Sequence, residues 1–390
     1  MGVIKVLQMP LRNNRGGIAR YILENWRLIN KDRFVFDFIT FNPSLDFEME
    51  LVAQGRKVYH LPRRGFDEDY FRHELGKILD SGYDVFHIHQ SRWTGTAANE
   101  VAMEKRIPRV IIHSHNTNIG SVITKAEEYE KYLKRHESIR DAFSSNWQRY
   151  ATHLCACSSM AAKWLFGDEL AQRNVLVLKN AIDTTKFAFN ETVRDTYRHE
   201  LGIDNCFVIG HVGRFFPVKN HEFIIRVFSE VSVSIPEARL LLIGDGELFN
   251  EVKALACKEK IFDKIVFLGL RDDVQFLMQA MDAFMLPSLF EGFPLVLVEA
   301  QTSGLKCLAS EAVTTETIIT PNLVHLPLKE KLWSDALIEL AMKGYERKNC
   351  ADLVELSGYS NSVSIMAIEE LYGGKQRGSG KHNSTDLQCG

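Results

Sequence analysis

Just past its midpoint the chain reads Phe207-Val208-Ile209-Gly210-His211-Val212-Gly213-Arg214. A short apolar run that ends in a glycine and a cation is typical of a buried parallel strand followed by a loop. Similar runs follow at intervals that leave room for a helix between neighbours, at 239–243, 264–268, 283–286, 306–309 and 324–327. Residues 207–327 therefore predict a parallel sheet with crossover helices.

The same pattern fills the chain before residue 207. Its runs lie at 3–9, 34–41, 57–61, 85–89, 109–113, 153–157 and 175–178. The 390 residues also exceed the size at which one hydrophobic core stops growing, which is roughly 250 to 300 residues. The sequence predicts an α/β protein with two doubly wound, Rossmann-like domains and a ligand cleft between the carboxyl ends of their sheets.

We expect five segments along the chain. The polar stretch 183–205, rich in Thr, Asn and charge, is the best linker candidate. It separates a first domain, 1–182, from a second domain, 206–357. Residues 358–373 form a separate closing segment, and residues 374–390 contain too few apolar side chains to pack, which predicts a disordered tail.

Composition and charge exclude several classes of protein. Apolar residues make up 45% of the chain and charged residues 25%, as in globular proteins. A net charge of −3 gives no whole-protein electrostatic case for binding nucleic acid. Residues 1–180 carry 26 basic and 21 acidic side chains, against 21 and 29 in the remainder. This basic first part could face an anionic substrate, an anionic membrane surface or simply solvent.

Cysteine usage and hydropathy indicate the compartment. Seven cysteines without a Cys-x-x-Cys pair exclude a disulfide framework, and Cys155 and Cys157 alternate as residues of a buried strand would. The N-terminus lacks the pattern of a secretion signal, and no run of about 18 apolar residues is free of charge. We expect a cytoplasmic protein whose membrane contact, where it occurs, is peripheral at the inner face.

Two loops after strands of the first domain carry candidate ligand contacts. Gly16 and Gly17 precede a helical pattern, and paired glycines let backbone N–H groups approach a phosphate or a sugar, although such a pair also serves as a plain turn. The pair is not the G-x-G-x-x-G of dinucleotide enzymes, which disfavours NAD. The strand at 109–113 runs into His115, and alternation places His113 on the same face. His115, nearest the cleft, is the candidate for substrate contact.

The sequence predicts no metal site. His113 and His115 lack a third ligand at a suitable spacing, and His87 and His89 lie on a separate strand. The acidic run Asp67-Glu68-Asp69 opens a helical pattern, where helix N-terminal charge explains it. We therefore expect no metal and no other cofactor.

The second domain carries a sharper pattern after its first strand. Arg214 and Lys219 follow Gly213 and lie five residues apart across a turn that contains a proline. A guanidinium and an ammonium that converge there would stabilise a diphosphate leaving group, because negative charge builds on its oxygens as the bond to carbon breaks. As two isolated surface cations they would carry no such meaning.

A second pattern follows the strand at residues 283 to 286. Pro294 suits the first turn of a helix and leaves the amides of Leu295 and Val296 without intrahelical acceptors, so these amides and the helix dipole form an anion seat. Glu291 precedes this helix, and Glu299 lies about one turn inside it. The two carboxylates can accept hydrogen bonds from sugar hydroxyls; ordinary helix charges are the alternative interpretation.

Together these stretches resemble glycosyltransferase family 4, the retaining GT-B enzymes also called glycosyl transferases group 1. The family's E-x7-E motif falls on Glu291 and Glu299, its arginine and lysine on Arg214 and Lys219, and its glycine-rich first loop on Gly16-Gly17. The resemblance covers residues 1–373. Further runs in the family's order and spacing are Val212-Gly213-Arg214, Leu242-Ile243-Gly244-Asp245-Gly246, Phe267-Leu268-Gly269, and Leu286-Pro287-Ser288 leading into Glu291-Gly292-Phe293-Pro294.

The resemblance implies a division of labour between the domains. The second domain would bind a nucleoside-diphosphate sugar, most often a UDP-sugar, and the first domain would bind the acceptor. Residues 358–373 resemble the family's last helix, which would cross back onto the first domain. Glu291 would position the transferred sugar, Glu299 would bind the ribose hydroxyls, and Arg214 with Lys219 would stabilise the departing diphosphate. The family's histidine matches His115, which would contact the sugar or the acceptor. Further donor contacts are expected at Gly16, Gly17, Gly213, Phe293, Pro294, Leu295 and Val296.

Three runs narrow the resemblance to bacterial capsule and exopolysaccharide transferases, namely 16–20, 113–117 and 161–167. This likeness implies transfer of a hexose, with retention of the anomeric configuration, to a glycan acceptor, and it points to a lipid-linked oligosaccharide as that acceptor. Two other functions stay open. A glycan phosphorylase could share the architecture, but no lysine context for pyridoxal phosphate is identifiable; a non-catalytic partner subunit could keep the fold and bind glycan or another transferase.

An aromatic stripe at helical spacing is a candidate membrane-docking surface. It comprises Tyr132, His136, Ile139, Phe143, Trp147 and Tyr150, and its basic neighbours are Lys131, Lys134, Arg135 and Arg140. Apolar residues at this spacing more often face the core of their own domain. We therefore favour a core-facing helix over a docking helix.

Overall fold

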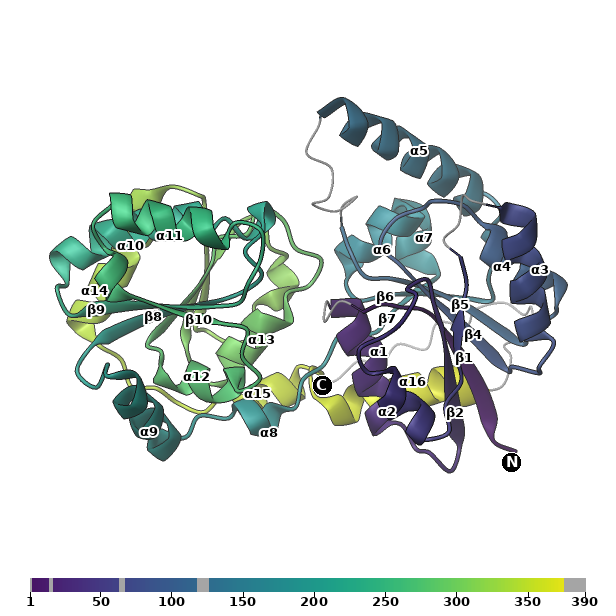
Figure 1. The fold of residues 1–390 in the computed structure, drawn as a ribbon, viewed down its shortest axis with the longest axis horizontal. Coiled ribbons are helices and arrows are strands. Elements are labelled where there is room, and N and C mark those ends of the chain that lie inside the picture. The colour runs from purple at the N-terminus through teal and green to yellow at the C-terminus, as the bar shows by residue number, and fades with distance from the viewer. Residues whose placement is uncertain (1, 14–16, 63–66, 118–125, 375–390) are drawn as a thin grey trace, which may run out of the picture.

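The computed structural model describes residues 2–13, 17–62, 67–117 and 126–374. Two parallel sheets form the centres of two domains that lie side by side (Figure 1). The strands of the first sheet are β1 (Ile4–Leu11), β2 (Phe34–Thr40), β3 (Val58–His60), β4 (Val85–Gln90), β5 (Arg109–Ser114), β6 (His153–Ala156) and β7 (Val175–Val177). Those of the second are β8 (Phe207–Val212), β9 (Ala238–Ile243), β10 (Ile265–Gly269), β11 (Ala283–Leu286), β12 (Lys306–Ser310) and β13 (Leu323–Leu326).

The strand order is β3-β2-β1-β4-β5-β6-β7 in the first sheet and β10-β9-β8-β11-β12-β13 in the second. In each sheet the order reverses beside the first strand of its series, as in doubly wound folds, and this switch point is where such sheets bind ligands. Every expected strand is present. The prediction of two Rossmann-like domains is confirmed.

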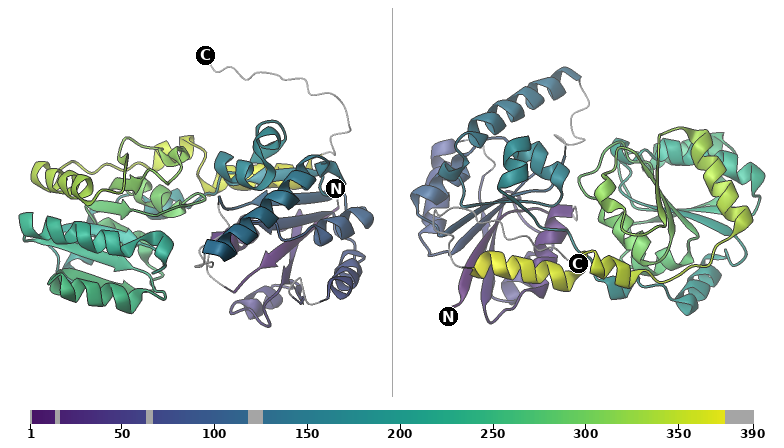
Figure 2. Two further views of the ribbon diagram at one scale, coloured as in Figure 1. Left: turned by 90° about the horizontal axis from the view of Figure 1, so that it is seen from above. Right: turned by 180° about the vertical axis from the view of Figure 1, so that it is seen from behind.

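Helices cover both faces of each sheet (Figures 1 and 2). The first domain contains α1 (Gly17–Leu28), α2 (Glu48–Ala53), α3 (Glu68–Leu79), α4 (Ala97–Glu104), α5 (Ala126–Ser144), α6 (Ser159–Phe166) and α7 (Asp168–Arg173). The second contains α10 (His221–Ser234), α11 (Phe249–Lys258), α12 (Val274–Ala280), α13 (Leu295–Thr302), α14 (Glu330–Lys343) and α15 (Ala351–Leu356). Asp67 caps α3 by accepting from the Tyr70 amide over 2.9 Å, so the acidic run at 67–69 is a helix start, as expected.

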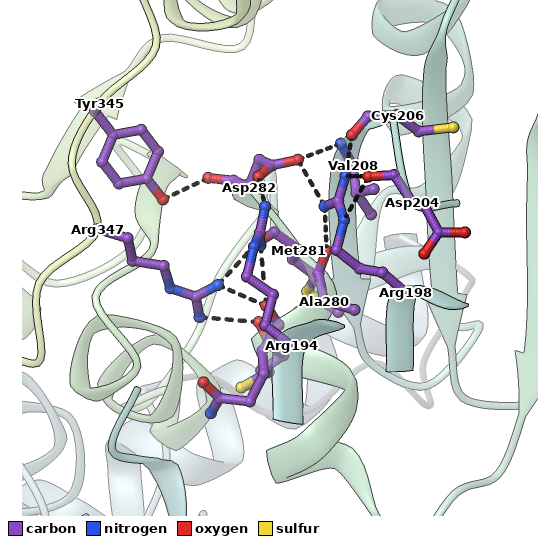
Figure 3. Close-up of polar contacts among 12 residues, drawn as sticks. Arg194, Arg198, Asp204, Cys206, Val208, Ala280, Met281, Asp282, Tyr345 and Arg347 are labelled. Atoms are coloured by element: carbon purple, nitrogen blue, oxygen red, sulfur yellow. Dashed lines mark hydrogen bonds and ion pairs between the residues drawn. The ribbon is translucent and has the colours of Figure 1, made fainter. Parts of the chain in front are cut away.

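The expected linker at 183–205 is not an open connection. It contains α8 (Thr184–Phe187) and α9 (Glu191–Leu201), and α9 packs against α12. Arg194 and Arg198 of α9 form ion pairs with Asp282, at distances of 2.5 and 3.2 Å (Figure 3). The polar composition of this stretch therefore serves a fixed set of ion pairs, and the segment belongs to the second domain.

Three arginines also bind the carboxyl end of α12, where backbone carbonyls lack helical partners. Arg347 donates to the carbonyls of Met278, Gln279 and Met281 over 2.7 to 3.0 Å (Figure 3). Arg194 donates to two of the same carbonyls, those of Gln279 and Met281, and Arg198 donates to the carbonyl of Ala280. Burial lowers the pKa of Arg347 to about 10. These arginines join α9, α12 and the segment after α14 into one unit.

The last helix, α16 (Asn361–Gly373), returns to the first domain and lies beside α1, as Figure 2 shows. Its residues Ile368, Leu371 and Tyr372 are buried in the first-domain core with Phe34 and Phe36. The predicted crossover helix is confirmed. The expected tail, 374–390, lies outside the described residues except for Gly374. Among the described helices, none has both the length and the apolar character needed to cross a bilayer.

Candidate active site

The two domains touch where the loop after β5 meets the loop before α13. At Gly292 an added Cβ would lie 2.8 Å from the carbonyl oxygen of His115, so only glycine permits this approach. Beside it, the Thr117 hydroxyl donates to the carbonyl of Glu291 over 3.0 Å. Elements from both domains therefore converge on the first glutamate of the predicted motif.

Glu291 is held by two side chains of its own domain. Its Oε1 atom accepts from Lys219 Nζ at 2.5 Å and from the Ser288 hydroxyl at 2.7 Å. Both charged side chains are mostly buried, with 19% of Lys219 and 15% of Glu291 exposed. An added Cβ at Gly213 would lie 2.8 Å from His211 Nε2, so this glycine makes room for the buried imidazole of His211 beside Lys219. The structure thus brings together the lysine and glutamate that the sequence placed 72 residues apart.

Glu299 lies in α13 and is 3% exposed. Its Oε1 atom accepts from the Arg20 guanidinium of α1 over 2.7 Å, which joins the domains a second time. The carboxylate raises the pKa of Arg20. Sequence analysis did not single out Arg20. The available signal was a cation three residues after Gly17, on a helix that begins at the expected cleft.

The amino end of α13 faces this junction. The helix begins at Leu295, and Pro294 is its N-cap, one residue earlier than the first-turn position expected from the sequence. Leu297 donates to the Pro294 carbonyl over 3.0 Å, so the amides of Leu295 and Val296 precede the first helical hydrogen bond. Phe293 stacks on Tyr359 with a centroid separation of 5.1 Å and is buried, so it can offer the cleft only its backbone.

Arg214 takes a different position from Lys219, although both follow β8. Its side chain is exposed, and its guanidinium carbon lies 4.1 Å from the ring centroid of Phe216. Among the residues that the structure describes, Arg214 forms no ion pair. At Gly244 an added Cβ would lie 2.0 Å from the Gly213 carbonyl oxygen, so the loop after β9 presses directly on this loop. Of the predicted pair of cations, Lys219 alone is fixed against a motif glutamate.

Four histidines gather at the ends of β4 and β5. Sequence spacing alone did not bring His87 and His89 to His113, but β4 and β5 are neighbours and His89 lies opposite His113. Ring nitrogens of these three side chains lie within 4.8 Å of one another, close enough to consider a metal ion. Both nitrogens of His87 and of His89, however, already lie against hydrogen-bonding partners. Burial lowers the pKa of all four, that of His115 to about 3.

The remaining candidates from the sequence are the paired glycines and the aromatic stripe. Gly17 starts α1, whereas Gly16 lies outside the described residues. The aromatic stripe of α5 faces the core at His136 and Phe143, which are 0% and 1% exposed, so the core-facing interpretation is confirmed there. Tyr132 is exposed and pairs with the guanidinium of Arg92 instead.

Two family models match consecutive parts of the chain. Residues 15–186 match Glycosyltransferase Family 4, and residues 193–352 match Glycosyl transferases group 1. Together with the paired parallel sheets, these matches define the class: the chain belongs to the family 4 glycosyltransferases with the GT-B fold.

Individual relatives support this membership. EpsF of Bacillus subtilis, a glycosyltransferase by name, is 29% identical over 378 residues, which cover 94% of this chain and 96% of EpsF. An Escherichia coli protein named UDP-Gal:alpha-D-GlcNAc-diphosphoundecaprenol alpha-1,3-galactosyltransferase is 27% identical over 392 residues. The aligned part covers 95% of this chain and 96% of the Escherichia coli protein. Among solved structures, Anabaena HepE in complex with UDP superposes on this chain with a TM-score of 0.75 at 17% identity. The superposition covers 95% of this chain and 100% of the HepE chain. The protein is therefore a GT-B glycosyltransferase.

Proposed function

We propose that the protein transfers a hexose from a UDP-sugar to a hydroxyl group of a lipid-linked glycan, with retention of configuration, in exopolysaccharide or capsule synthesis. The observation that carries the proposal is the meeting of Lys219, Glu291 and the amino end of α13 with the His115 loop of the other domain. The UDP bound by HepE and the lipid-linked acceptor in the name of the Escherichia coli relative support the choice of substrates.

The arrangement suits a diphosphate leaving group. As the bond between the anomeric carbon and the diphosphate breaks, negative charge grows on the phosphate oxygens, where Lys219 and the amides of Leu295 and Val296 can stabilise it. Arg214, which is exposed on the same loop as Lys219, would join them when a donor binds. The acceptor oxygen takes the place of the diphosphate on the same face of the sugar, and its proton passes to the leaving group.

The two glutamates act on the sugars of the donor. Glu291, held by Lys219 and Ser288, would accept from hydroxyls of the transferred hexose. Glu299 would accept from the ribose hydroxyls after sharing or releasing Arg20. Because an ammonium, a guanidinium and a helix amino end supply the positive charge at the diphosphate, we propose that the reaction needs no divalent metal and no other cofactor.

A lipid-linked acceptor would bring the protein to the inner face of a membrane. We include peripheral contact of the first domain in the proposal, through the exposed basic residues Lys131, Lys134 and Arg135 of α5. Flotation with liposomes that contain anionic lipid tests this part. The triple Glu variant should stay at the bottom of the gradient while the wild type floats; equal flotation contradicts membrane contact through α5.

The experiment that tests the transferase proposal is a panel of nucleoside-diphosphate sugars offered to purified protein in EDTA. We expect binding and slow hydrolysis of one UDP-sugar, and loss of hydrolysis in the Arg214→Ala/Lys219→Ala double variant. Hydrolysis that requires added Mg²⁺ or Mn²⁺ would contradict metal independence. If no donor binds, a non-catalytic partner subunit becomes the better account.

A further inference from the structure

A chain of polar side chains crosses the first domain from His115 at the cleft to the crossover helix α16. His115 Nε2 lies 2.8 Å from His89 Nδ1, and His89 Nε2 lies 2.7 Å from Gln8 Oε1. The Gln8 amide nitrogen donates to the Tyr372 hydroxyl over 3.0 Å. His115 directly follows β5, and the other three members come from β4, β1 and α16, so residues 364 positions apart share one network.

A second branch leaves Tyr372 and stays buried. The Tyr372 hydroxyl lies 2.6 Å from His87 Nδ1, and His87 Nε2 lies 3.2 Å from His113 Nδ1. Gln8, His87, His89 and Tyr372 are each between 1% and 4% exposed. Because solvent cannot reach these groups, wherever two members lie at hydrogen-bond distance one must donate and the other must accept.

The orientation of the Gln8 amide determines which nitrogen of each histidine carries the hydrogen. Burial keeps the histidines neutral, and a neutral imidazole carries one N–H and one acceptor nitrogen. The Gln8 oxygen can only accept, so His89 carries its hydrogen on Nε2 and must accept at Nδ1. His115 therefore donates from Nε2. Its other nitrogen, Nδ1, is left as an acceptor.

The same reasoning assigns the hydrogens in the branch that leaves Tyr372. Because Gln8 donates to the Tyr372 oxygen, the Tyr372 hydrogen goes to His87 Nδ1. His87 then donates from Nε2 to His113 Nδ1, and His113 keeps its hydrogen on Nε2, a buried nitrogen with no hydrogen-bond partner among the described residues. Tyr372 thus anchors the amide orientation of Gln8, and through Gln8 it acts on His89 and His115.

We propose that Gln8, His89 and Tyr372 are positioning residues that hold His115 in its Nε2–H tautomer, with Nδ1 presented as an acceptor for a hydroxyl of the transferred sugar or of the acceptor. This inference rests on the proposed function, which places His115 at the transfer site. It also gives α16 a part in the reaction, because the helix supplies the hydroxyl that orients the network.

A double-mutant cycle tests this role. Tyr372→Phe keeps the ring that packs on Phe34 and Phe36 and removes the hydroxyl. We expect it to lower kcat for donor hydrolysis about 10- to 100-fold, as loss of an orienting partner does, with donor KM unchanged. In a His115→Ala background the same change should have no further effect. An equal loss of kcat with and without His115 would overturn the proposal.

A matched control separates orientation from plain stability. Tyr83 is another buried tyrosine of the first domain, and its hydroxyl donates to Asp37 over 2.8 Å, outside the histidine network. Tyr83→Phe should keep kcat. Gln8→Met serves as a second test variant, because it removes both amide contacts at similar volume; its kcat should fall as in Tyr372→Phe, and a kcat as high as that of Tyr83→Phe would count against the network.

The tautomer itself can be observed without any turnover. Protein labelled with ¹⁵N-histidine and assigned with His115→Gln should show the Nε2–H tautomer at His115, and the Tyr372→Phe variant should show a mixture. A wild-type Nδ1–H tautomer, or a spectrum unchanged by Tyr372→Phe, refutes the proposal. If the wild type hydrolyses no donor, the proposed function fails, whereas this spectrum still decides the positioning role.

Discussion

At the scale of single residues, the site depends on a few side chains that cannot exchange roles. Lys219 and Arg214 leave the same loop, but only Lys219 is fixed against Glu291, whereas Arg214 rests exposed on Phe216. The lysine is therefore already in position, and the arginine must reorient when an anion binds. This difference predicts unequal effects of removing them.

Lys219→Ala should lower kcat about 100- to 1,000-fold, comparable to removing one preorganised donor from a charged transition state. The fold should persist, because the lost partner, Glu291, keeps its hydrogen bond from Ser288. Donor hydrolysis measured beside a thermal melt checks both parts. An unchanged kcat would show that Lys219 does not stabilise the leaving group.

Glu299→Ala should act on donor binding instead. Ribose is remote from the bond that breaks, so we expect donor KM to rise about 10-fold or more while kcat changes little. Calorimetric titration with UDP and steady-state kinetics measure the two quantities separately. A collapse of kcat at unchanged donor affinity would show that Glu291 and Glu299 have the opposite roles.

Residue-scale prediction from sequence had a clear limit. The motif spacing pointed to Lys219, Glu291 and Glu299, which the structure places beside the junction of the two domains. Arg20 and the histidine network were missed, since they depend on which strands are neighbours and on their register. His89 meets His113 only because β4 pairs with β5, and Gln8 meets Tyr372 only because α16 returns to the first sheet.

At the scale of elements, the strands were predictable and one set of helices was not. Apolar β-branched runs mark buried parallel strands directly, and every predicted run forms one. The stretch 183–205 looked like a linker because α9 is mostly polar, but its arginines bind Asp282 and the end of α12. Polar composition indicates a linker only where the charges lack partners inside the protein.

Arg347→Ala should destabilise the second domain by about 3 kcal/mol, because it removes a largely buried guanidinium that donates to the carbonyls of Met278, Gln279, Met281 and Ser303. Urea unfolding followed through Trp333, which is buried in the second-domain core, measures this change. The neighbouring Lys348 is exposed, and Lys348→Ala should leave the midpoint unchanged. Equal midpoints for both variants would contradict the structural role of Arg347.

At the scale of the whole molecule, the chain crosses between the domains twice at one place. Ile182 and Ser360 form an isolated parallel bridge, with the Ile182 amide donating to the Tyr359 carbonyl and the Asn361 amide to the Ile182 carbonyl, each over 3.0 Å. Closure of the cleft must therefore bend two hydrogen-bonded segments together.

The first domain should lose stability as the pH falls. Burial lowers the pKa of His87, His89 and His113 well below the ordinary value, so they stay neutral in the folded state but gain protons in the unfolded chain. The contribution of these histidines to the free energy of unfolding is complete above a pH of about 6.5. Below that pH the free energy of unfolding falls, with a slope of up to about 1.4 kcal/mol per pH unit for each histidine.

Urea midpoints at pH 7.5, 6.5 and 5.5 test this sign. In a Trp333→Phe variant the remaining tryptophans all belong to the first domain and report its unfolding alone. The midpoint should drop steeply between pH 6.5 and 5.5. His73→Gln, which removes an exposed histidine of α3, should give the same profile, and a midpoint independent of pH would contradict burial of the three histidines in neutral form.

The position of Tyr372 has a consequence for biosynthesis. The first domain precedes the second along the chain, yet its core and its histidine network are completed by a helix that is translated only after the whole second domain. A nascent chain that has emerged through α15 but not α16 should hold a finished second domain beside a first domain whose face beside α1 is still uncovered. Premature termination near the 3′ end of the message would therefore damage the opposite half of the protein from the one in which the stop codon falls.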